Sequence, residues 1–561
     1  MVDWRSRKLG DLLTFANGVV FVILINLLVS NEFFRFDLTE EKRYSAKPET
    51  LHILESLEDE IHVEVFLAGK LNASFQRFQK ALLETLDEFR IYSKNKVTYS
   101  ISDPAIATSE KARNEYMADL ASRGIQPTNI IDTRDGQREE KIIFPGVIIS
   151  YGGLEKGVML LKGNKAGTPE QEINQSIEGI EYEIVNAIYN LINVDRKQIG
   201  FVTGHGELDS LQSFSFRNQL SEVYDVFDVM LSAKEDVNSF NVLIVAKPTV
   251  SFSEKDKYLL DQYVMQGGKL LLLVDKVDAS MDSVAREDYF AGPNNLNLDD
   301  QLFRYGVRIN PDLVQDRRSG VYPVVTGVVG GKPRMQLMEW PFFPLIGQFA
   351  NHPITRNLDA VLTRFCNSID TVKAPNVVKT PLLMTSPYAR KISTPVHINV
   401  NELRKNLRDA DYTTQFIPVG VLLEGKFTSL YKNRFPPEGV GSTSVIAESV
   451  PTKIVVIADG DIARNDVNPR NNQPQPLGFD PMTNTTFANR DFLLNALAYL
   501  SDEGGLIQAR NKEVKIRPLD KVKLKDERVK WQVLNLVLPL ALVIGYGVLR
   551  FYLRKRRFAK F

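Results

Sequence analysis

The chain has 561 residues, 43% of them apolar, so it is too long for one hydrophobic core and two or more domains are expected. Its 69 basic and 69 acidic residues balance, yet residues 550–561 carry +6 and residues 12–549 a net −7, which argues against nucleic-acid or anionic-lipid binding by the bulk of the chain. The single cysteine, Cys366, excludes an intramolecular disulfide framework and a cysteine-based zinc site.

Two apolar stretches, Leu12–Ser30 and Trp531–Leu549, lie near opposite ends of the chain. Each has 19 residues without a charged side chain, and as a helix each spans roughly 28 Å, the thickness of a bilayer's hydrocarbon core. A cleaved signal peptide is the alternative for the first stretch, but its apolar run is longer than a typical signal and no small-residue cleavage site follows it. We therefore expect two transmembrane helices that flank a large outer region.

The flanking charges predict the orientation of these two helices. Arg5, Arg7 and Lys8 precede the first one, and six basic residues follow the second. Basic residues near membrane spans stay in the cytoplasm, so both termini are expected there, with the bulk of the chain in the periplasm of a bacterial inner membrane. The basic tail is expected to rest on anionic headgroups.

Three positions interrupt the apolar stretches: Asn17, Asn26 and Pro539. Such residues often face partner helices, which makes them candidate intramembrane contacts, although single Asn residues can also simply be tolerated. The expected segments are a cytoplasmic N-terminus (1–11), a transmembrane helix (12–30), a first periplasmic domain (31–195), a second periplasmic domain (196–510), a linker (511–530), a transmembrane helix (531–549) and a basic cytoplasmic tail (550–561).

The first periplasmic domain is expected to follow the order β-α-β-α-β-β-α. Its pattern predicts a strand at Ile61–Leu67, a helix at Ser74–Ser93, a strand at Lys96–Ile101, a helix at Glu110–Arg123, a hairpin of Lys141–Tyr151 and Gly157–Lys162, and a helix at Glu172–Leu191. This order is compatible with a thioredoxin-like sheet. Because the chain has no C-x-x-C sequence, thioredoxin-type redox chemistry is excluded.

The second periplasmic domain alternates short apolar strands with helices. Strands are expected at Gln198–Val202, Val226–Leu231, Val242–Ala246, Lys269–Val274, Leu382–Thr385, Ile417–Glu424 and Lys453–Ala458, and helices at Phe214–Val223, Ser253–Gln266, Asn297–Tyr305 and Asn489–Leu500. This alternation favours a doubly wound parallel sheet. Residues 315–350, rich in Gly, Pro and aromatic side chains, are expected to form an excursion loop or a small hairpin lobe.

The first candidate site follows the first strand of this domain, at Gly204, His205, Gly206 and Glu207. Ligands of open α/β sheets bind outside the carboxyl ends of strands, glycines there permit close backbone approach, and His with Glu can act as acid and base. The alternative is a tight turn in which both side chains bond the loop, and we favour it because no nucleophile accompanies the pair.

The second candidate site follows the Lys453–Ala458 strand, where Asp459 and Asp461 flank a glycine. Two carboxylates can hold Mg²⁺ or Ca²⁺, but Asp-Gly is also a common turn sequence, and we favour the turn. The Gly-rich segment 326–333 lacks the spacing of a phosphate loop, so no nucleotide site is expected there. No metal ligand set and no cofactor are predicted from the five scattered histidines.

Several segments resemble the GldG family, the gliding-motility-associated auxiliary proteins of an ABC transporter in Bacteroidetes. The segments that carry the resemblance are Asp37–Ser45, Gly200–Leu208 with its G-H-G-E-L sequence, His352–Thr355 and Asp459–Asp461. The resemblance implies a partnership with a polytopic permease (GldF-like) and, through it, a cytoplasmic ATPase (GldA-like). It also implies that the second domain is similar to flavodoxin-like or class I glutamine-amidotransferase-like folds, without the catalytic cysteine.

The sequence thus predicts a non-enzymatic, membrane-anchored periplasmic component of an ABC transporter complex, with no ATP site of its own. One alternative is a membrane-bound hydrolase in which His205, Glu207, Asp459 and Asp461 converge on one pocket. Another is a periplasmic glycan- or peptide-binding module, with Trp340, Phe342, Phe343 and Phe349 as a stacking platform; a packed loop core is the competing interpretation of these aromatic residues.

Overall fold

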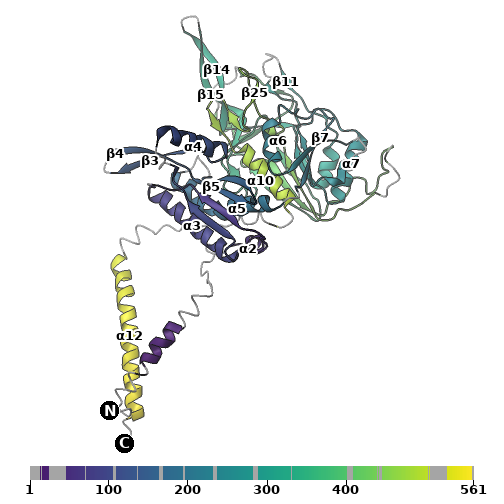
Figure 1. The fold of residues 1–561 in the computed structure, drawn as a ribbon. Helices are drawn as coiled ribbons and strands as arrows, with labels where there is room; N and C mark the ends of the chain where they lie inside the picture. The colour runs from purple at the N-terminus through teal and green to yellow at the C-terminus, as the bar shows by residue number, and fades with distance from the viewer. Residues whose placement is uncertain are drawn as a thin grey trace. The chain divides into compact units, whose positions relative to one another are not determined.

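The computed structural model describes residues 13, 15–24, 46–69, 71–104, 109–134, 137–162, 168–193, 196–231, 237–281, 289–329, 332–400, 408–438, 440, 445–502, 505 and 527–558. The chain divides into two compact units, Met1–Lys512 and Glu513–Phe561, which are treated separately. Within the first unit, two sheet-containing regions follow one another along the chain, and together they form a mixed α/β structure (Figure 1).

The first region is built on a four-stranded sheet in the order β2-β1-β5-β6. The strands are β1 (Ile61–Val65), β2 (Val97–Ile101), β5 (Gly146–Tyr151) and β6 (Leu154–Met159), and the helices are α2 (Pro48–Glu55), α3 (Ala73–Tyr92), α4 (Glu110–Ser122) and α5 (Pro169–Ile192). Strands β1 and β2 are parallel, whereas β5 and β6 are antiparallel to their neighbours. The expected β-α-β-α-β-β-α elements occur in this order, with one additional hairpin between α4 and β5.

A second hairpin, β3 (Thr128–Arg134) with β4 (Gln137–Ile143), was not expected. The sequence analysis merged the end of β4 with β5 into one strand, Lys141–Tyr151. Pro145 separates them, because proline cannot donate a ladder hydrogen bond. Between β5 and β6, Gly152 and Gly153 both have positive φ, as a tight two-residue hairpin turn requires.

The second region contains an eight-stranded sheet in the order β16-β19-β22-β23-β10-β9-β7-β8. Its strands are β7 (Gln198–Thr203), β8 (Asp225–Met230), β9 (Val242–Ala246), β10 (Lys269–Leu273), β16 (Gln348–Phe349), β19 (Val377–Met384), β22 (Pro418–Gly425) and β23 (Thr452–Ile457). The helices of this region are α6 (Phe214–Ser221), α7 (Glu254–Met265), α9 (Asp299–Tyr305) and α10 (Asn489–Ser501).

Only part of this sheet is parallel. Strands β8, β7, β9, β10 and β23 run parallel, in the chain order 2-1-3-4-5, whereas β22, β19 and β16 continue the sheet antiparallel. The expectation of a doubly wound parallel sheet is therefore right for the pairing of five strands and wrong for the three strands that extend the sheet antiparallel. Two neighbouring parallel strands need a crossover connection, which is usually a helix. Among the described residues, the only helical segment between β19 and β22 is the short turn Asp409–Asp411, and there is none between β22 and β23, so these neighbours pair antiparallel.

The second region contains further strands outside the eight-stranded sheet, and some of them form a separate lobe. They are β11 (Phe290–Ala291), β12 (Val307–Ile309), β13 (Asp312–Asp316), β14 (Ser319–Val329), β15 (Lys332–Ile346), β17 (Val361–Leu362), β18 (Ile369–Thr371), β20 (Ala389–Ser393), β21 (Val396–His397), β24 (Val467–Asn468), β25 (Gln473–Pro474), β26 (Phe479–Asp480) and β27 (Thr485–Thr486). The hairpin lobe expected at residues 315–350 is confirmed as the long β14–β15 hairpin.

The aromatic residues of this lobe form a core and not a stacking platform. Trp340, Phe342 and Phe343 are buried, and the Trp340 ring lies 4.7 Å from that of Phe343 and 5.7 Å from that of Phe365. The platform interpretation is therefore wrong, because these rings are already covered by one another.

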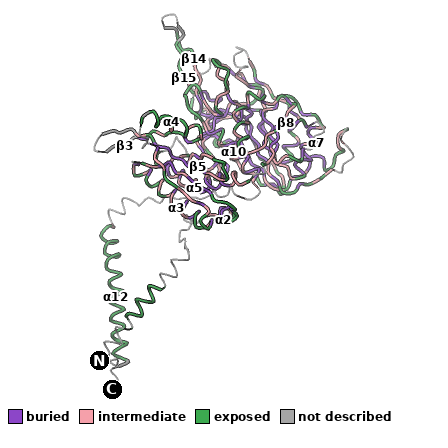
Figure 2. Tube along the Cα trace, viewed as in Figure 1, coloured by how far each residue is buried: buried purple, intermediate pink, exposed green. Residues whose placement is uncertain are grey.

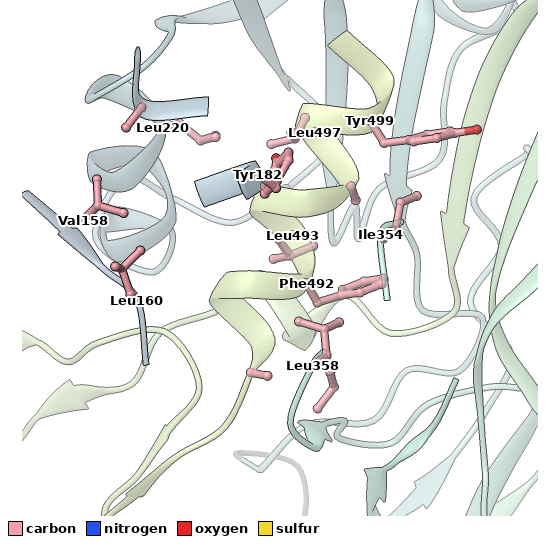
Figure 3. Close-up of a cluster of buried hydrophobic side chains, with 14 of the residues drawn as sticks. Val158, Leu160, Tyr182, Leu220, Ile354, Leu358, Phe492, Leu493, Leu497 and Tyr499 are labelled. Carbon is pink, nitrogen blue, oxygen red and sulfur yellow. The ribbon is translucent and has the colours of Figure 1, made fainter. Parts of the chain in front are cut away.

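Helix α10 lies in one continuous hydrophobic cluster that joins the two regions. Its Leu493 and Leu497 face the side where Tyr182 of α5 and Leu160 lie, and its Phe492 packs near Leu358 (Figure 3). The same cluster continues into alternate residues of β7, β9, β10 and β23. Figure 2 shows the buried residues gathered in these elements. The other face of the sheet is covered by a second cluster from α7 and α9.

Of the second unit, the described residues form α12 (Arg528–Phe558), and its segment Arg528–Arg556 is long and apolar enough to cross a membrane. Pro539 lies inside this helix. The first apolar stretch is described only in part, as a 10-residue helix, Phe15–Leu24, that contains Asn17; Asn26 lies outside the described residues. Of the two expected spans, the described residues thus contain one helix of sufficient length.

Truncating Leu497 to alanine tests the shared core. The side chain is fully buried in the cluster that joins the two regions, so Leu497→Ala is expected to lower the free energy of unfolding by about 2–5 kcal/mol. Urea denaturation of the detergent-solubilised chain, followed by tryptophan fluorescence, measures this change. Leu154→Ala is the control, because Leu154 is exposed and should cost less than about 0.5 kcal/mol. Equal costs for the two variants would contradict the assignment.

Candidate functional site

The carboxyl ends of the parallel strands form the edge where both predicted sites lie. Strand β7 ends at Thr203 and is followed by Gly204 and Gly206, both with positive φ. A Cβ atom at Gly206 would lie 2.2 Å from the hydroxyl oxygen of Thr249, so a side chain there would collide with the neighbouring loop. The glycines therefore let the β7 loop turn sharply and approach the loop after β9.

His205 is buried and held on three sides. Its ring stacks on Phe252, with centroids 3.7 Å apart and planes inclined by 10°. Nδ1 lies 3.0 Å from a carboxylate oxygen of Glu207, and Nε2 lies 3.3 Å from a carboxylate oxygen of Asp256. The second oxygen of Glu207 accepts a hydrogen bond of 2.7 Å from the His205 backbone N–H. These contacts fasten the turn, as the turn interpretation of the sequence proposes.

The two carboxylates decide the protonation of His205. Burial lowers the pKa of the imidazole, but hydrogen bonding and charge from Glu207 and Asp256 outweigh burial and raise the pKa above 6.5. Both ring nitrogens face acceptors, so the protonated ring can donate to each of them. The ring thereby clasps two elements, the loop after β7 through Glu207 and helix α7 through Asp256.

The crevice between β7 and β9 is the place where a doubly wound sheet of this order binds ligands, because the strand order reverses there. Here the two bordering loops are hydrogen-bonded to each other. The carbonyl oxygen of His205 accepts from the backbone N–H groups of Thr249 and Val250, each at 2.8 Å. The Thr249 hydroxyl donates to the carbonyl of Gly206, and Leu208 N–H donates to the carbonyl of Ala246. Backbone groups that would approach a ligand are thus bonded within the chain.

A buried charge cluster occupies the next part of the same edge. Lys247, which follows β9, has its ammonium 2.6 Å from a carboxylate oxygen of Asp461 and 3.0 Å from one of Asp275. Asp275 also accepts a hydrogen bond of 2.6 Å from Gly460 N–H. Asp459 accepts from the backbone N–H groups of Arg364 and Asp461, each at 2.8 Å. Asp459 and Asp461 therefore belong to an internal network.

Burial and the neighbouring charges shift the pKa values of the carboxylates in this cluster. Burial raises the pKa of Asp461, but the Lys247 ammonium outweighs burial and lowers it below the usual value. Burial raises the pKa of Asp459 well above its usual value, and the carboxylates of Asp275 and Asp461 add to this. Lys247 thus takes the position between two carboxylates where a cation would otherwise bind, and no ligand set of three His, Cys, Asp or Glu side chains occurs among the described residues.

The structure does not bring the two predicted pairs into contact. Strands β9 and β10 lie between β7, which carries His205 and Glu207, and β23, which carries Asp459 and Asp461. Among the described residues, no hydrogen bond or ion pair joins one pair to the other. The loop after β9 contacts both, through Lys247 on one side and Thr249 on the other.

Four residues of this edge were missed by the sequence analysis: Lys247, Asp256, Asp275 and Arg364. Two of them could have been predicted from their position in the sequence. Lys247 and Asp275 come directly after the expected apolar strands Val242–Ala246 and Lys269–Val274. No sequence pattern places Asp256 and Arg364 at this edge, because their positions depend on how α7 and the 363–368 segment pack.

Comparison with known proteins gives the family. The fold and the site define a mixed α/β protein with a doubly wound sheet core whose ligand edge is bonded internally. The model of the ABC-type uncharacterized transport system family matches residues 196–496, more than half of the chain, and the chain belongs to this family. A domain of unknown function (DUF7088) matches residues 40–150.

Individual relatives are distant. The chain is 20% identical to an uncharacterized protein of Borreliella burgdorferi over 448 residues, which cover 77% of this chain and 80% of that protein. Among solved structures, the mmIFT52 N-terminal domain is similar with 14% identity and a TM-score of 0.30, over 54% of this chain and 97% of the solved chain.

Replacing Lys247 by methionine tests the internal role of the charge cluster. The variant leaves Asp275 and Asp461 buried without their cation, so Lys247→Met is expected to lower the free energy of unfolding by about 3–5 kcal/mol. Urea denaturation measures it. The matched control is Lys432→Met, whose partner Glu448 is exposed, and it should cost less than about 1 kcal/mol. A stable Lys247→Met protein would argue against a structural cluster.

The titration of His205 tests the clasp. Because its folded-state pKa lies above the unfolded value of about 6.5, its contribution to stability is complete below pH 6.5 and is lost as the pH rises through the folded-state pKa. NMR titration of the imidazole should give a midpoint above 6.5, and Glu207→Gln should lower it. Glu448→Gln, at a distant exposed carboxylate, should leave it unchanged. A wild-type midpoint below 6.5 would refute the clasp.

Proposed function

We propose that the chain is a non-enzymatic, membrane-anchored auxiliary component of an ABC transporter complex. Its membership of an ABC transport family supports the association with a transporter. The observation that carries the non-enzymatic part is the internal bonding of the sheet edge: the β7 and β9 loops are bonded to each other, and Lys247 forms ion pairs with Asp275 and Asp461 beside them. An enzyme or binding protein of this architecture would keep these groups available for a ligand.

The membrane helix α12 supports the anchoring part of the proposal. Its apolar segment is followed within the same helix by Arg550, Arg554, Lys555 and Arg556. Basic residues next to a span stay in the cytoplasm. We therefore propose that the C-terminus is cytoplasmic and that residues 31–510 lie in the periplasm of a bacterial inner membrane. We propose that the Leu12–Ser30 stretch is a second anchor that crosses the membrane in the opposite direction, so that both termini are cytoplasmic.

The partners we propose are a polytopic permease (GldF-like) and, through it, a cytoplasmic ATPase (GldA-like), in a complex of the gliding-motility type. The resemblance of the Gly200–Leu208 segment to GldG supports this choice. Within the membrane, Asn17, Asn26 and Pro539 are the proposed contacts with the permease, since polar and Pro positions in spans are commonly satisfied by neighbouring helices.

Co-purification from native membranes tests this function. A tagged chain, solubilised in mild detergent, is expected to bring down a polytopic membrane subunit and an ATPase in fixed ratio, identified by mass spectrometry. A control chain that ends before Glu527 lacks α12. The amount of permease recovered with it should be at least ten-fold lower than with the full chain. Recovery of the full chain as a lone monomer from native membranes would overturn the proposal.

A further inference from the structure

A small cavity lies at the edge of the eight-stranded sheet opposite the edge that carries His205. Its volume is about 100 Å³, and it is bounded by α5, by the residues that immediately precede β7 and β8, and by the end of α10. Its lining consists mainly of tyrosine, asparagine and charged residues. A polar cavity at a junction between two sheet-containing regions is a common place for a ligand, and none of the bonds that close the other edge obstructs it.

The α5 wall of the cavity carries amide side chains. Tyr182, Asn186 and Asn190 follow one another at four-residue spacing, so they lie on one face of the helix. Tyr182 is buried and lies near Leu497 of α10 (Figure 3), whereas the two asparagines are partly exposed. Among the described residues, neither asparagine amide is hydrogen-bonded to another part of the chain.

These two asparagines are unfavourable choices for the helix itself. Asparagine is a poorer helix former than alanine, because its side chain competes for hydrogen bonds with the backbone. In the last two turns of α5, Asn186 and Asn190 therefore lower the stability of the helix without an internal contact that offsets this cost. Their amides remain available to a ligand in the cavity.

The opposite wall is held in place by its own hydrogen bonds. The Lys197 ammonium donates to the carbonyl oxygen of Ser501, and the Tyr224 hydroxyl lies 3.1 Å from the Ser501 hydroxyl. All three residues line the cavity. The cavity thus exists before any ligand binds, which reduces the conformational entropy lost on binding.

The charges around the cavity favour a neutral ligand. Arg196 donates to two backbone carbonyl oxygens and forms an ion pair with Asp225. The other charged residues of the lining, Lys197 and Asp502, have opposite signs. Because the cations are matched by carboxylates, an anionic ligand gains no net attraction here.

Size excludes a ring. An apolar cavity of roughly 150 Å³ holds benzene, so a cavity of about 100 Å³ is too small to enclose a sugar ring. It fits a small planar group such as one peptide unit. A side-chain amide has both a donor and an acceptor, as a peptide unit does, so Asn186 and Asn190 can satisfy its N–H and its carbonyl oxygen.

We propose that the cavity binds one peptide unit of an extended segment of another protein, with the Asn186 and Asn190 amides as its hydrogen-bond partners. One peptide unit alone supplies little affinity, so the segment belongs to a larger partner whose further contacts lie outside the cavity. Binding at this cavity does not depend on the transporter association proposed above, because it uses only residues of the first unit.

Ligand-observed NMR on the detergent-solubilised full chain tests the site. The neutral probe N-acetyl-trialanine-N-methylamide is expected to bind saturably, and combining Asn186→Ala with Asn190→Ala is expected to weaken its binding by roughly ten-fold or more. Asn114→Ala, at an exposed position of α4, is the matched control and should leave binding unchanged. Because alanine is the better helix former, the double variant should unfold at the same or a higher temperature.

Three results would overturn the proposal. The first is no saturable binding of the tripeptide, and the second is binding that the double variant retains. The third is binding of methyl β-glucoside or acetate that is at least as tight and is lost in the double variant, since the site would then select a sugar or an anion. A lower unfolding temperature of the double variant would show that the two amides are structural.

Photo-crosslinking in native membranes tests the source of the segment. A photoreactive amino acid at Asn193, an exposed residue of the lining, is expected to form an adduct with a second polypeptide, and excess tripeptide should suppress it. The same probe at Asn114 should give no adduct that the tripeptide suppresses. An adduct with a free short peptide or with another copy of this chain, or no suppressible adduct, would overturn the assignment to another protein. Failure of a permease to co-purify would leave these results unaffected, so the two proposals can fail separately.

Discussion

The structure of the first unit depends on the burial of helix α10 between the eight-stranded sheet and helix α5. Leu493, Leu497 and Leu500 of this helix are fully buried, and they join one cluster with residues of α5 and of the parallel strands. Asn489, at the start of the helix, exchanges hydrogen bonds with the backbone of Leu362 and so also fixes the strand β17. Because apolar burial is the main favourable term in folding, removing α10 would expose both regions at once.

Polar contacts continue this junction at the surface of the shared core. Arg356 forms an ion pair with Glu178, and Asn357 donates a hydrogen bond to the carbonyl of Gln175, so the segment before β17 is bonded to α5. Lys156 of β6 pairs with Glu222 after α6. The two regions therefore meet through an apolar centre with a polar border, which is the composition of a permanent contact rather than of two separately mobile domains.

The organisation of the sheet edge accounts for an enzyme-like fold without an open ligand site. The strand order creates a crevice between β7 and β9, but Gly206 allows the two loops to come close enough for backbone hydrogen bonds. Lys247, with its positive φ, turns back into the edge and meets Asp275 and Asp461. The groups that would select a ligand are thereby used to hold the loops, and fold alone is a poor guide to activity here.

The strands and helices that could be predicted from the sequence are those with a recognisable pattern within their own residues. The apolar runs of β7, β9, β10 and β23, and the G-H-G-E turn, were recognisable because burial on both faces leaves continuous apolar residues. The antiparallel extension was not, because β19 and β22 have the same apolar character as the parallel strands and only their connections differ. For the site, the turn interpretation of His205 could be reached, whereas its partner Asp256, 51 residues further on, could not.

The end of α10 carries a further consequence. Its last residue, Ser501, accepts a hydrogen bond from the Lys197 ammonium through its carbonyl oxygen, and its hydroxyl is 3.1 Å from the Tyr224 hydroxyl, so the helix terminus is bonded to the residues that immediately precede β7 and β8. Along the chain, α12 follows α10 after residues 502–527. These bonds hold the last turn of α10 to the segments that enter two neighbouring strands, so the end of this helix cannot loosen without disturbing the start of β7 and β8.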